Sequence, residues 1–159
     1  MDDHQRLADL KDLLELLYEK LGEFEKDLII NANQSAKFEM KQRIKREVLP
    51  DIRRYETEYW NLYPSESIIV SSQDAETHLS QIEKAVWDIE HIPSTKYPEA
   101  LMPLLKEIRD LLDEDDKSAS AKLKVALPLI PSIASYELEM NTEKVMYQVW
   151  KSLIRLIRK

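Results

Sequence analysis

Hydrophobic residues recur at helical spacing along most of the chain. Near the N-terminus, seven of them follow one another at alternating intervals of three and four residues, which predicts a single long helix over residues 4–30. These residues are Leu7, Leu10, Leu14, Leu17, Leu21, Phe24 and Leu28. Leu13 and Leu16 widen the apolar stripe beyond a coiled-coil seam, so we expect this helix to pack on more than one neighbour.

A second amphipathic pattern follows over residues 35–62. Its apolar positions are spaced mostly by four residues, and they are Met40, Ile44, Val48, Ile52, Tyr55 and Tyr59. Residues 31–34 read as a turn, because asparagine tolerates left-handed backbone and bonds locally to it. Pro50 removes a backbone donor and disfavours helical geometry at Leu49, so we expect a kink or break there. The short turn predicts that the two helices are antiparallel neighbours.

Residues 63–73, YPSESIIVSSQ, interrupt the helical period and are expected to form a linker. Asp74 can cap the next helix, whose apolar residues Ala75, Leu79, Ile82, Val86 and Ile89 alternate four and three apart. A further helix is expected from Pro98 to Leu112, with Pro103 near its start, and the acidic run 113–116 then forms a solvated loop.

The stretch from 118 to 140 is the hardest part of the sequence to interpret. Residues 118–127 fit a helix, and Pro128 and Pro131 are expected to disrupt it. Residues 133–140 fit either a short extended segment or another helical turn. A last amphipathic helix is expected over 142–158, capped by Asn141 or Thr142.

These patterns predict an all-α protein with two parts. Residues 1–62 form an N-terminal antiparallel helical hairpin, residues 63–73 link it onward, and residues 74–159 form a small C-terminal helical bundle.

Charge is unevenly distributed along the 159 residues, whose net charge is −7. Residues 1–62 carry 14 acidic and 11 basic side chains, and residues 63–140 carry 15 and 7. Residues 141–159 carry one acidic and five basic side chains. An acidic body disfavours nucleic acid as a partner, because phosphate binding needs a basic face.

Composition also narrows the chemistry. The chain has no cysteine, one glycine and three histidines. Thiol catalysis and thiolate zinc sites are therefore excluded, and so are the glycine-dependent phosphate loops and nucleophile elbows. An EF-hand loop from Asp113 would need glycine and glutamate where Ser118 and Lys124 stand. We expect no cofactor, no metal and no enzymatic activity, because no nucleophile, base and oxyanion donor can be assembled.

One candidate partner-binding surface lies on the second helix. It combines basic and aromatic side chains: Arg43, Arg46, Arg53, Arg54, Tyr55, Tyr59 and Trp60. Arginine, tyrosine and tryptophan dominate binding hot spots, and the arginines suit an acidic partner. The alternative is structural: the aromatics cap the core and the charges, balanced by nearby acids, form a solvated face.

The last helix is a second candidate surface. Trp150 belongs to its apolar face, and its basic residues include Lys151, Arg155 and Arg158. Such a helix either lies on an anionic membrane surface or docks on the acidic middle of the same chain. We favour docking, because one such helix alone binds membranes weakly.

Targeting signals are not apparent. The polar, acidic start MDDHQRLADL differs from a signal peptide, and no apolar stretch reaches transmembrane length. A cytoplasmic location is the resulting expectation.

Two stretches, DLKDLLELLYEKLGEFEKDLI (9–29) and KFEMKQRIKREVLPDIRRYETEYW (37–60), resemble the helical modules of bacterial effector-associated domains. Residues 122–150, KLKVALPLIPSIASYELEMNTEKVMYQVW, are similar to a region of the same kind of proteins. In that group the modules precede caspase-like, TIR-type or NTPase modules and recruit partners by like-with-like contact. Since this chain has no attached effector enzyme, the resemblance implies a free adaptor or the partner of an effector encoded elsewhere.

The functional expectation is therefore a non-enzymatic protein–protein interaction adaptor that couples a sensor to an effector in bacterial signalling or defence. Its partner is a protein, including another copy of the chain in a homo-oligomer. Two alternatives remain: a peripheral membrane protein that uses the basic last helix, and a regulatory subunit of an enzyme.

Overall fold

A computed structural model of the chain describes residues 3–92, 97–140 and 144–157. Within these ranges the secondary structure consists of helices joined by turns, and no strand is present. The prediction of an all-α protein is therefore confirmed. The chain divides into two compact units, Met1–Leu62 (unit 1) and Tyr63–Lys159 (unit 2).

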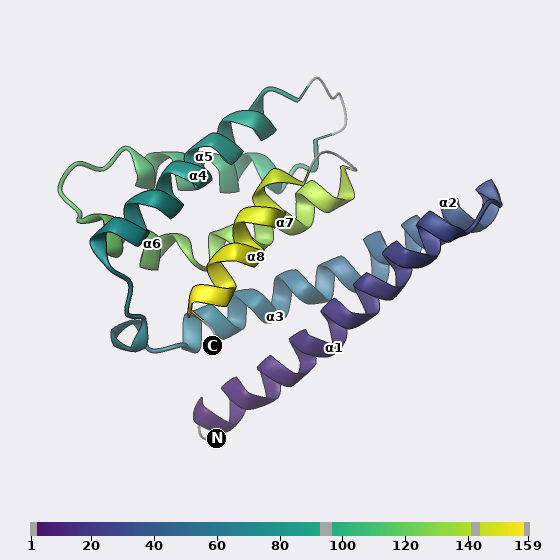
Figure 1. Ribbon diagram of the computed structural model, residues 1–159, viewed down its shortest axis with the longest axis horizontal. Coiled ribbons are helices and arrows are strands. Elements are labelled where there is room, and N and C mark those ends of the chain that lie inside the picture. Colours follow the sequence, from purple (N-terminus) through teal and green to yellow (C-terminus); the bar gives the residue numbers. More distant parts are fainter. Residues whose placement is uncertain (1–2, 93–96, 141–143, 158–159) are drawn as a thin grey trace. The chain divides into compact units, whose positions relative to one another are not determined.

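Unit 1 is built from two long helical runs. The first is α1 (Asp3–Ile30), and the second comprises α2 (Gln34–Arg43), a π-helical turn (Ile44–Val48) and α3 (Leu49–Leu62). Asn33 caps α2 by accepting hydrogen bonds from the backbone nitrogens of Ser35 and Ala36 at 2.9 and 3.2 Å. The turn between Ile30 and Gln34 reverses the chain, so α1 and the α2–α3 run lie antiparallel (Figure 1).

The second run does not break at Pro50. Leu49 keeps helical dihedral angles, φ −63° and ψ −41°, so the expected break is wrong. The chain instead widens into the π-helical turn directly before the proline, where Leu49 N–H bonds to the carbonyl of Ile44. A π turn changes the backbone hydrogen-bond register, which lets the helix continue past a residue without a donor.

α1 packs against α3 and the π-helical turn. The predicted leucine stripe supplies the buried residues Leu10, Leu14 and Leu21. On the other run, Ile44, Val48, Leu49 and Ile52 are buried as well. Burial of this apolar surface is the main favourable free energy available to two antiparallel helices.

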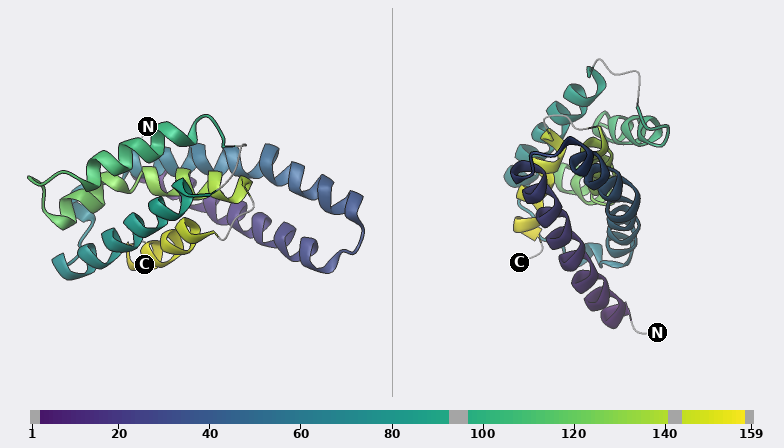
Figure 2. Two further views of the ribbon diagram at one scale, coloured as in Figure 1. Left: turned by 90° about the horizontal axis from the view of Figure 1, so that it is seen from above. Right: turned by 90° about the vertical axis from the view of Figure 1, so that its right-hand side faces the viewer.

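Unit 2 begins with a short 3₁₀ turn at Ser65–Ser67 and continues as five helices within its described residues. They are α4 (Ser72–Glu90), α5 (Leu101–Leu112), α6 (Ala119–Ala126), α7 (Leu129–Glu139) and α8 (Val145–Ile157). α4 packs against α5, α6 and α8, and α7 packs against α5 and α8 (Figure 2).

The starts of α4 and α5 differ from the expectations. Ser71 rather than Asp74 caps α4, since its hydroxyl accepts the Asp74 backbone N–H at 3.1 Å. The helix expected from Pro98 begins at Leu101, which leaves Pro103 in the first turn, where its missing donor has no intrahelical partner to lose. The expected linker residues 63–73 also contain the 3₁₀ turn and a buried side chain, Ile68.

α7 is the main departure from the sequence-based prediction. The helix predicted over 118–127 is α6, and it ends at Ala126 before Pro128, as expected. The prolines also start the next helix, because Pro128 precedes α7 and Pro131 lies in its first turn. Residues 133–139 are helical, and the extended alternative is wrong. Most of α7 is buried, including Ile130, Ile133 and Ala134, which explains why its sequence shows no amphipathic period.

The final helix starts later than expected, at Val145. The expected caps Asn141 and Thr142 lie outside the described residues. No helix in the described ranges has the length and apolar character needed to cross a membrane.

Candidate functional site

The predicted basic and aromatic residues of unit 1 fall into two groups in the structure. Arg43, Arg46 and Arg54 are exposed, and Arg53 and Tyr55 are partly exposed. Arg54 lies over the Tyr55 ring, with its guanidinium carbon 4.7 Å from the ring centroid, and pairs with Asp51 at 3.1 Å. These side chains form a charged surface that is available to a partner.

The other two aromatics belong to the core. Tyr59 and Trp60 are only 4% and 6% exposed, and their rings meet edge to face at 4.9 Å. Trp60 Nε1–H donates to the buried carboxylate of Glu56 at 3.2 Å, and the Tyr18 hydroxyl donates to the same carboxylate at 2.7 Å. This arrangement corresponds to the structural alternative, in which the aromatics cap the core.

In the last helix, the apolar face points into unit 2. Met146, Val149, Trp150 and Leu153 are buried, and α8 packs on α4 and α7. Lys151 and Arg155 are exposed, and Lys151 lies 5.0 Å from the centroid of the Tyr147 ring. Arg158 lies outside the described residues. Membrane insertion of this helix would require its buried face to leave the core of unit 2.

A buried carboxylate ties α8 to α7. The side chain of Glu137 accepts the backbone N–H groups of Met146 and Tyr147, both at 2.9 Å. Burial raises the pKa of Glu137, while these hydrogen bonds and the charge of Lys144 oppose the shift. Because both carboxylate oxygens are bound to the first turn of α8, Glu137 acts as a long-range helix cap. Glu137 therefore has a structural role, because its carboxylate joins the last turn of α7 to the first turn of α8.

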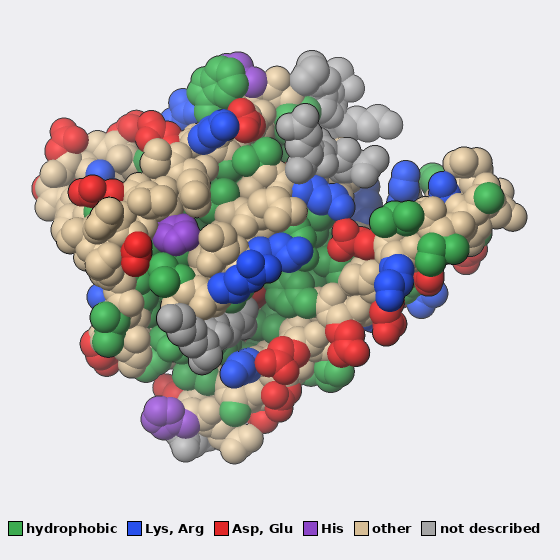
Figure 3. Space-filling view, viewed as in Figure 1, with side chains coloured by type: hydrophobic (Ala, Val, Ile, Leu, Met, Phe, Trp, Pro, Cys, Tyr) green, Lys and Arg blue, Asp and Glu red, His purple; other side chains and the backbone are tan. Residues whose placement is uncertain are grey.

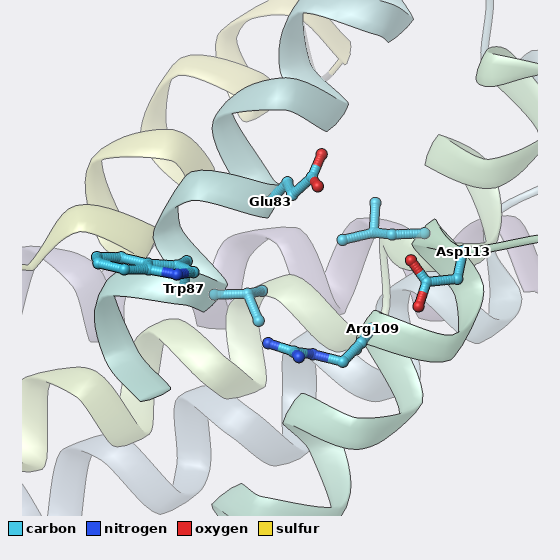
Figure 4. Close-up of a pocket in the computed structure, with 6 residues that line it drawn as sticks. Glu83, Trp87, Arg109 and Asp113 are labelled. Atoms are coloured by element: carbon cyan, nitrogen blue, oxygen red, sulfur yellow. The ribbon is translucent and has the colours of Figure 1, made fainter. Parts of the chain in front are cut away.

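The most distinctive surface feature of unit 2 is an exposed tryptophan beside a hollow between α4 and α5. The Trp87 side chain is 56% exposed, whereas Val86 beside it is buried. The hollow has a volume of about 180 Å³ and is lined by Glu83, Val86, Trp87, Arg109, Leu112 and Asp113. Figure 4 shows Glu83, Arg109 and Asp113 pointing into the space between the two helices, with the Trp87 indole at its edge.

Local contacts hold this surface in place. The Trp87 ring stacks on His91, with centroids 3.9 Å apart, and His91 Nδ1 lies 2.8 Å from the Trp87 carbonyl oxygen. Arg109 forms an ion pair with Glu90 on α4. Trp87, Glu90 and Arg109 lie on α4 or α5, and His91 directly follows α4, so the indole packs against the C-terminal end of α4.

A second, shallower hollow lies on the other side of Trp87. It is lined by Ser80, Glu83, Lys84, Trp87 and Asp88. Trp87 and Glu83 therefore border both hollows, and we call the surface formed by the two hollows and these residues the Trp87 face.

The Trp87 face suits binding better than catalysis. The hollow between α4 and α5 is lined by two carboxylates, one guanidinium and apolar groups. The second hollow adds the hydroxyl of Ser80, but no histidine lines either hollow to act as its base. An exposed indole flanked by charges of both signs is typical of a protein-interaction hot spot. In the described part of the chain, no group of three His, Cys, Asp or Glu side chains is arranged to hold a metal ion.

Sequence analysis missed this face, although a signal was present. The apolar stripe of α4 passes through Ile82, Val86 and Ile89, and Trp87 falls outside it. A large aromatic residue off the buried stripe of a helix must face solvent or a partner.

Comparison with known proteins adds no relationship: no family model, no curated protein and no solved structure matches the chain.

Proposed function

We propose that the chain is a non-enzymatic adaptor that binds a protein partner through the Trp87 face. The observation that carries the proposal is a half-exposed tryptophan that stacks on His91 beside a charged hollow. Tryptophan gives a large contact area with few rotatable bonds, so its side chain binds at low entropic cost.

The finer architecture is part of the same proposal. Unit 1 is a helical hairpin that acts as an interaction module, and unit 2 is a helical bundle that carries the Trp87 face. Arg43, Arg46, Arg53, Arg54 and Tyr55 offer a second protein contact on unit 1, suited to an acidic partner or another copy of the chain. The resemblance to bacterial effector-associated domains adds a role to this proposal: the chain couples a sensor to an effector in bacterial signalling or defence.

Replacement of the indole tests the proposal. Wild-type chain and a Trp87→Ala variant would be crosslinked in the cells that produce them, and bound proteins would be quantified by mass spectrometry. We expect the variant to lose its main partner at least about tenfold, since hot-spot truncations cost about 2 kcal/mol or more.

A Met102→Ala variant is the matched control, because Met102 is a large exposed apolar residue of α5 that does not line either hollow. It should retain the partner. Equal recovery of every protein by wild type and Trp87→Ala, or a wild-type chain that captures nothing, would reject the proposal.

A further inference from the structure

A second surface lies at the end of unit 1 where α1 turns into α2. Three large hydrophobic side chains are exposed there: Ile29 by 84%, Ile30 by 75% and Phe38 by 65%. Ile29 and Ile30 fall outside the buried leucine stripe of α1, and α2 has no buried residue. These side chains therefore contribute nothing to the core of unit 1. We call this surface the hairpin tip.

The hairpin tip contrasts in charge with the rest of the protein. Residues 28–36 contain no charged side chain, and residues 37–46 contain five bases, Lys37, Lys41, Arg43, Lys45 and Arg46, against one acid, Glu39. Residues 1–22 of the same unit carry six acids and three bases, and the last turns of α1 beside α2, residues 23–27, add three acids and one base. The whole end of the hairpin, residues 23–46, therefore carries six bases and four acids. An uncharged segment, residues 28–36, is thus followed by a basic one, residues 37–46, in a chain whose net charge is −7.

The exposed apolar side chains and the basic side chains lie next to each other in the structure. Phe38, Lys41 and Lys45 are three and then four residues apart, so they lie along one side of the helical run. Lys41, Arg43, Lys45 and Arg46 are exposed, and Arg43 also covers the Phe24 ring at 5.0 Å. Figure 3 shows hydrophobic and basic side chains over the end of unit 1 formed by α1 and α2, together with acidic side chains along α1.

We propose that the hairpin tip binds the surface of a membrane that contains anionic lipid, with Ile29, Ile30 and Phe38 entering the interface and the lysines of α2 and the π-helical turn, Lys37, Lys41 and Lys45, meeting the headgroups. Apolar side chains at an interface gain free energy by leaving water, and each nearby lysine or arginine adds attraction to anionic lipid. The inference goes beyond the proposed function and is independent of the Trp87 face.

Shape and charge favour a bilayer over other occupants. The end of a two-helix hairpin is narrow, and a stable protein interface needs about 800 Å² from each partner. A bilayer needs only a few inserted side chains together with basic groups behind them. A nucleic acid would use the basic residues and leave the three apolar side chains in water.

The test is sedimentation of the full-length chain with phosphatidylcholine vesicles that contain, or lack, about one third phosphatidylserine. We expect binding to the anionic vesicles only, weakened as the salt concentration rises from about 0.1 to about 0.5 M. An Ile29→Asp/Ile30→Asp variant and a Lys41→Glu/Lys45→Glu variant should each lower the partition coefficient at least about tenfold.

Two matched variants control for non-specific effects. Leu16→Asp adds one negative charge at an exposed leucine of α1 outside the tip, and Lys106→Glu reverses one exposed lysine of unit 2, so each makes half the charge change of the tip variant that it controls. Both should bind vesicles like wild type. Circular dichroism would check that every variant keeps its helical content, as expected for changes at exposed positions.

The proposal is overturned if wild type does not sediment with anionic vesicles, or if the tip variants bind as well as wild type. It is also overturned if a polyglutamate peptide binds the tip while the vesicles do not, because the surface would then serve an acidic protein.

Discussion

The two units bury a glutamate in different ways. In unit 1, Glu56 accepts side-chain donors, the Tyr18 hydroxyl from α1 and Trp60 Nε1–H from its own helix. In unit 2, Glu137 accepts backbone N–H groups of Met146 and Tyr147 at the start of α8. Both carboxylates are at most 1% exposed.

The difference concerns what each glutamate holds in place. Glu56 joins side chains of helices that already share an apolar interface, so its hydrogen bonds add specificity to a packed pair. The first backbone N–H groups of a helix have no acceptor within the helix. Glu137 supplies acceptors for these groups in α8, so the start of α8 depends on it. Loss of the carboxylate should therefore cost unit 2 more than unit 1.

Removal of the α8 cap should have the largest effect. Glu137→Ala leaves two buried backbone donors without an acceptor, and we expect it to lower the free energy of unfolding of unit 2 by about 3 kcal/mol. Urea denaturation would measure the loss, and hydrogen exchange would show α8 unprotected first. An unchanged denaturation midpoint would contradict the capping role.

The pH dependence of the same residue should be the next largest effect. The pKa of Glu137 is raised in the folded state, so in the interval between its unfolded and folded pKa the folded chain binds more protons. Its contribution to stability is then greatest below the unfolded pKa and falls as the pH rises, by at most about 1.4 kcal/mol per pH unit.

A Glu137→Gln variant keeps the shape of the side chain and removes the titration. The stability of wild type minus that of the variant, measured from about pH 4 to about pH 7, should fall as the pH rises, because other groups such as Glu58 titrate alike in both proteins. Parallel pH profiles for the two proteins would mean that Glu137 does not titrate in this interval.

In unit 1, loss of one donor to Glu56 should have a smaller effect. Tyr18→Phe removes the hydroxyl and keeps the ring, and hydrogen bonds to a charged acceptor contribute about 1.5–3 kcal/mol. We expect a loss near the lower end, about 1.5 kcal/mol, because Trp60 still binds the carboxylate. Hydrogen exchange should confine the change to α1 and α3, and a loss as large as that of Glu137→Ala would erase the contrast between the units.

The smallest effect is expected at the Arg6–Glu58 pair, which joins α1 to α3 through two contacts of 2.5 and 2.8 Å. The Arg6 guanidinium lowers the pKa of Glu58, so the pair stabilises the fold above the unfolded pKa of Glu58 and loses this effect as the pH falls through the folded pKa. Both side chains are partly exposed, and solvent screens the interaction.

Arg6→Gln should therefore shift Tm by no more than about 3 °C, and the shift should shrink in high salt. A larger shift that is insensitive to salt would show that packing of the Arg6 stem, rather than charge, holds the helix ends together.

The all-α fold class could be predicted from the sequence, because the spacing of hydrophobic residues indicates which face of a helix is buried. The seven-residue stripe of the first helix predicts residues 4–30, and α1 spans Asp3–Ile30. The method fails for α7, whose residues are buried on nearly all sides, because a helix without a polar face has no periodic signal. Pro128 and Pro131 made the prediction harder, because proline breaks a helix in its interior but is favoured in its first turn.

The candidate surfaces were only partly visible in the sequence. Arg43, Arg46, Arg53, Arg54 and Tyr55 were recognised by residue type, whereas Tyr59 and Trp60, chosen on the same criterion, lie in the core. Ile29, Ile30, Phe38 and Trp87 were not selected, although each falls outside the apolar stripe of its helix. Residue type alone does not separate a buried aromatic from an exposed one.

The sequence by itself determined that the chain is helical and where most of the helices lie. It also excluded cysteine-based sites and glycine-rich phosphate loops. These properties depend on residue identity and local spacing. Tertiary structure decided which apolar residues remain in water, how Glu137 reaches a helix end eight to ten residues away, and how the chain passes Pro50 without breaking. These features depend on which surfaces meet after folding, and a linear pattern of residues does not contain that information.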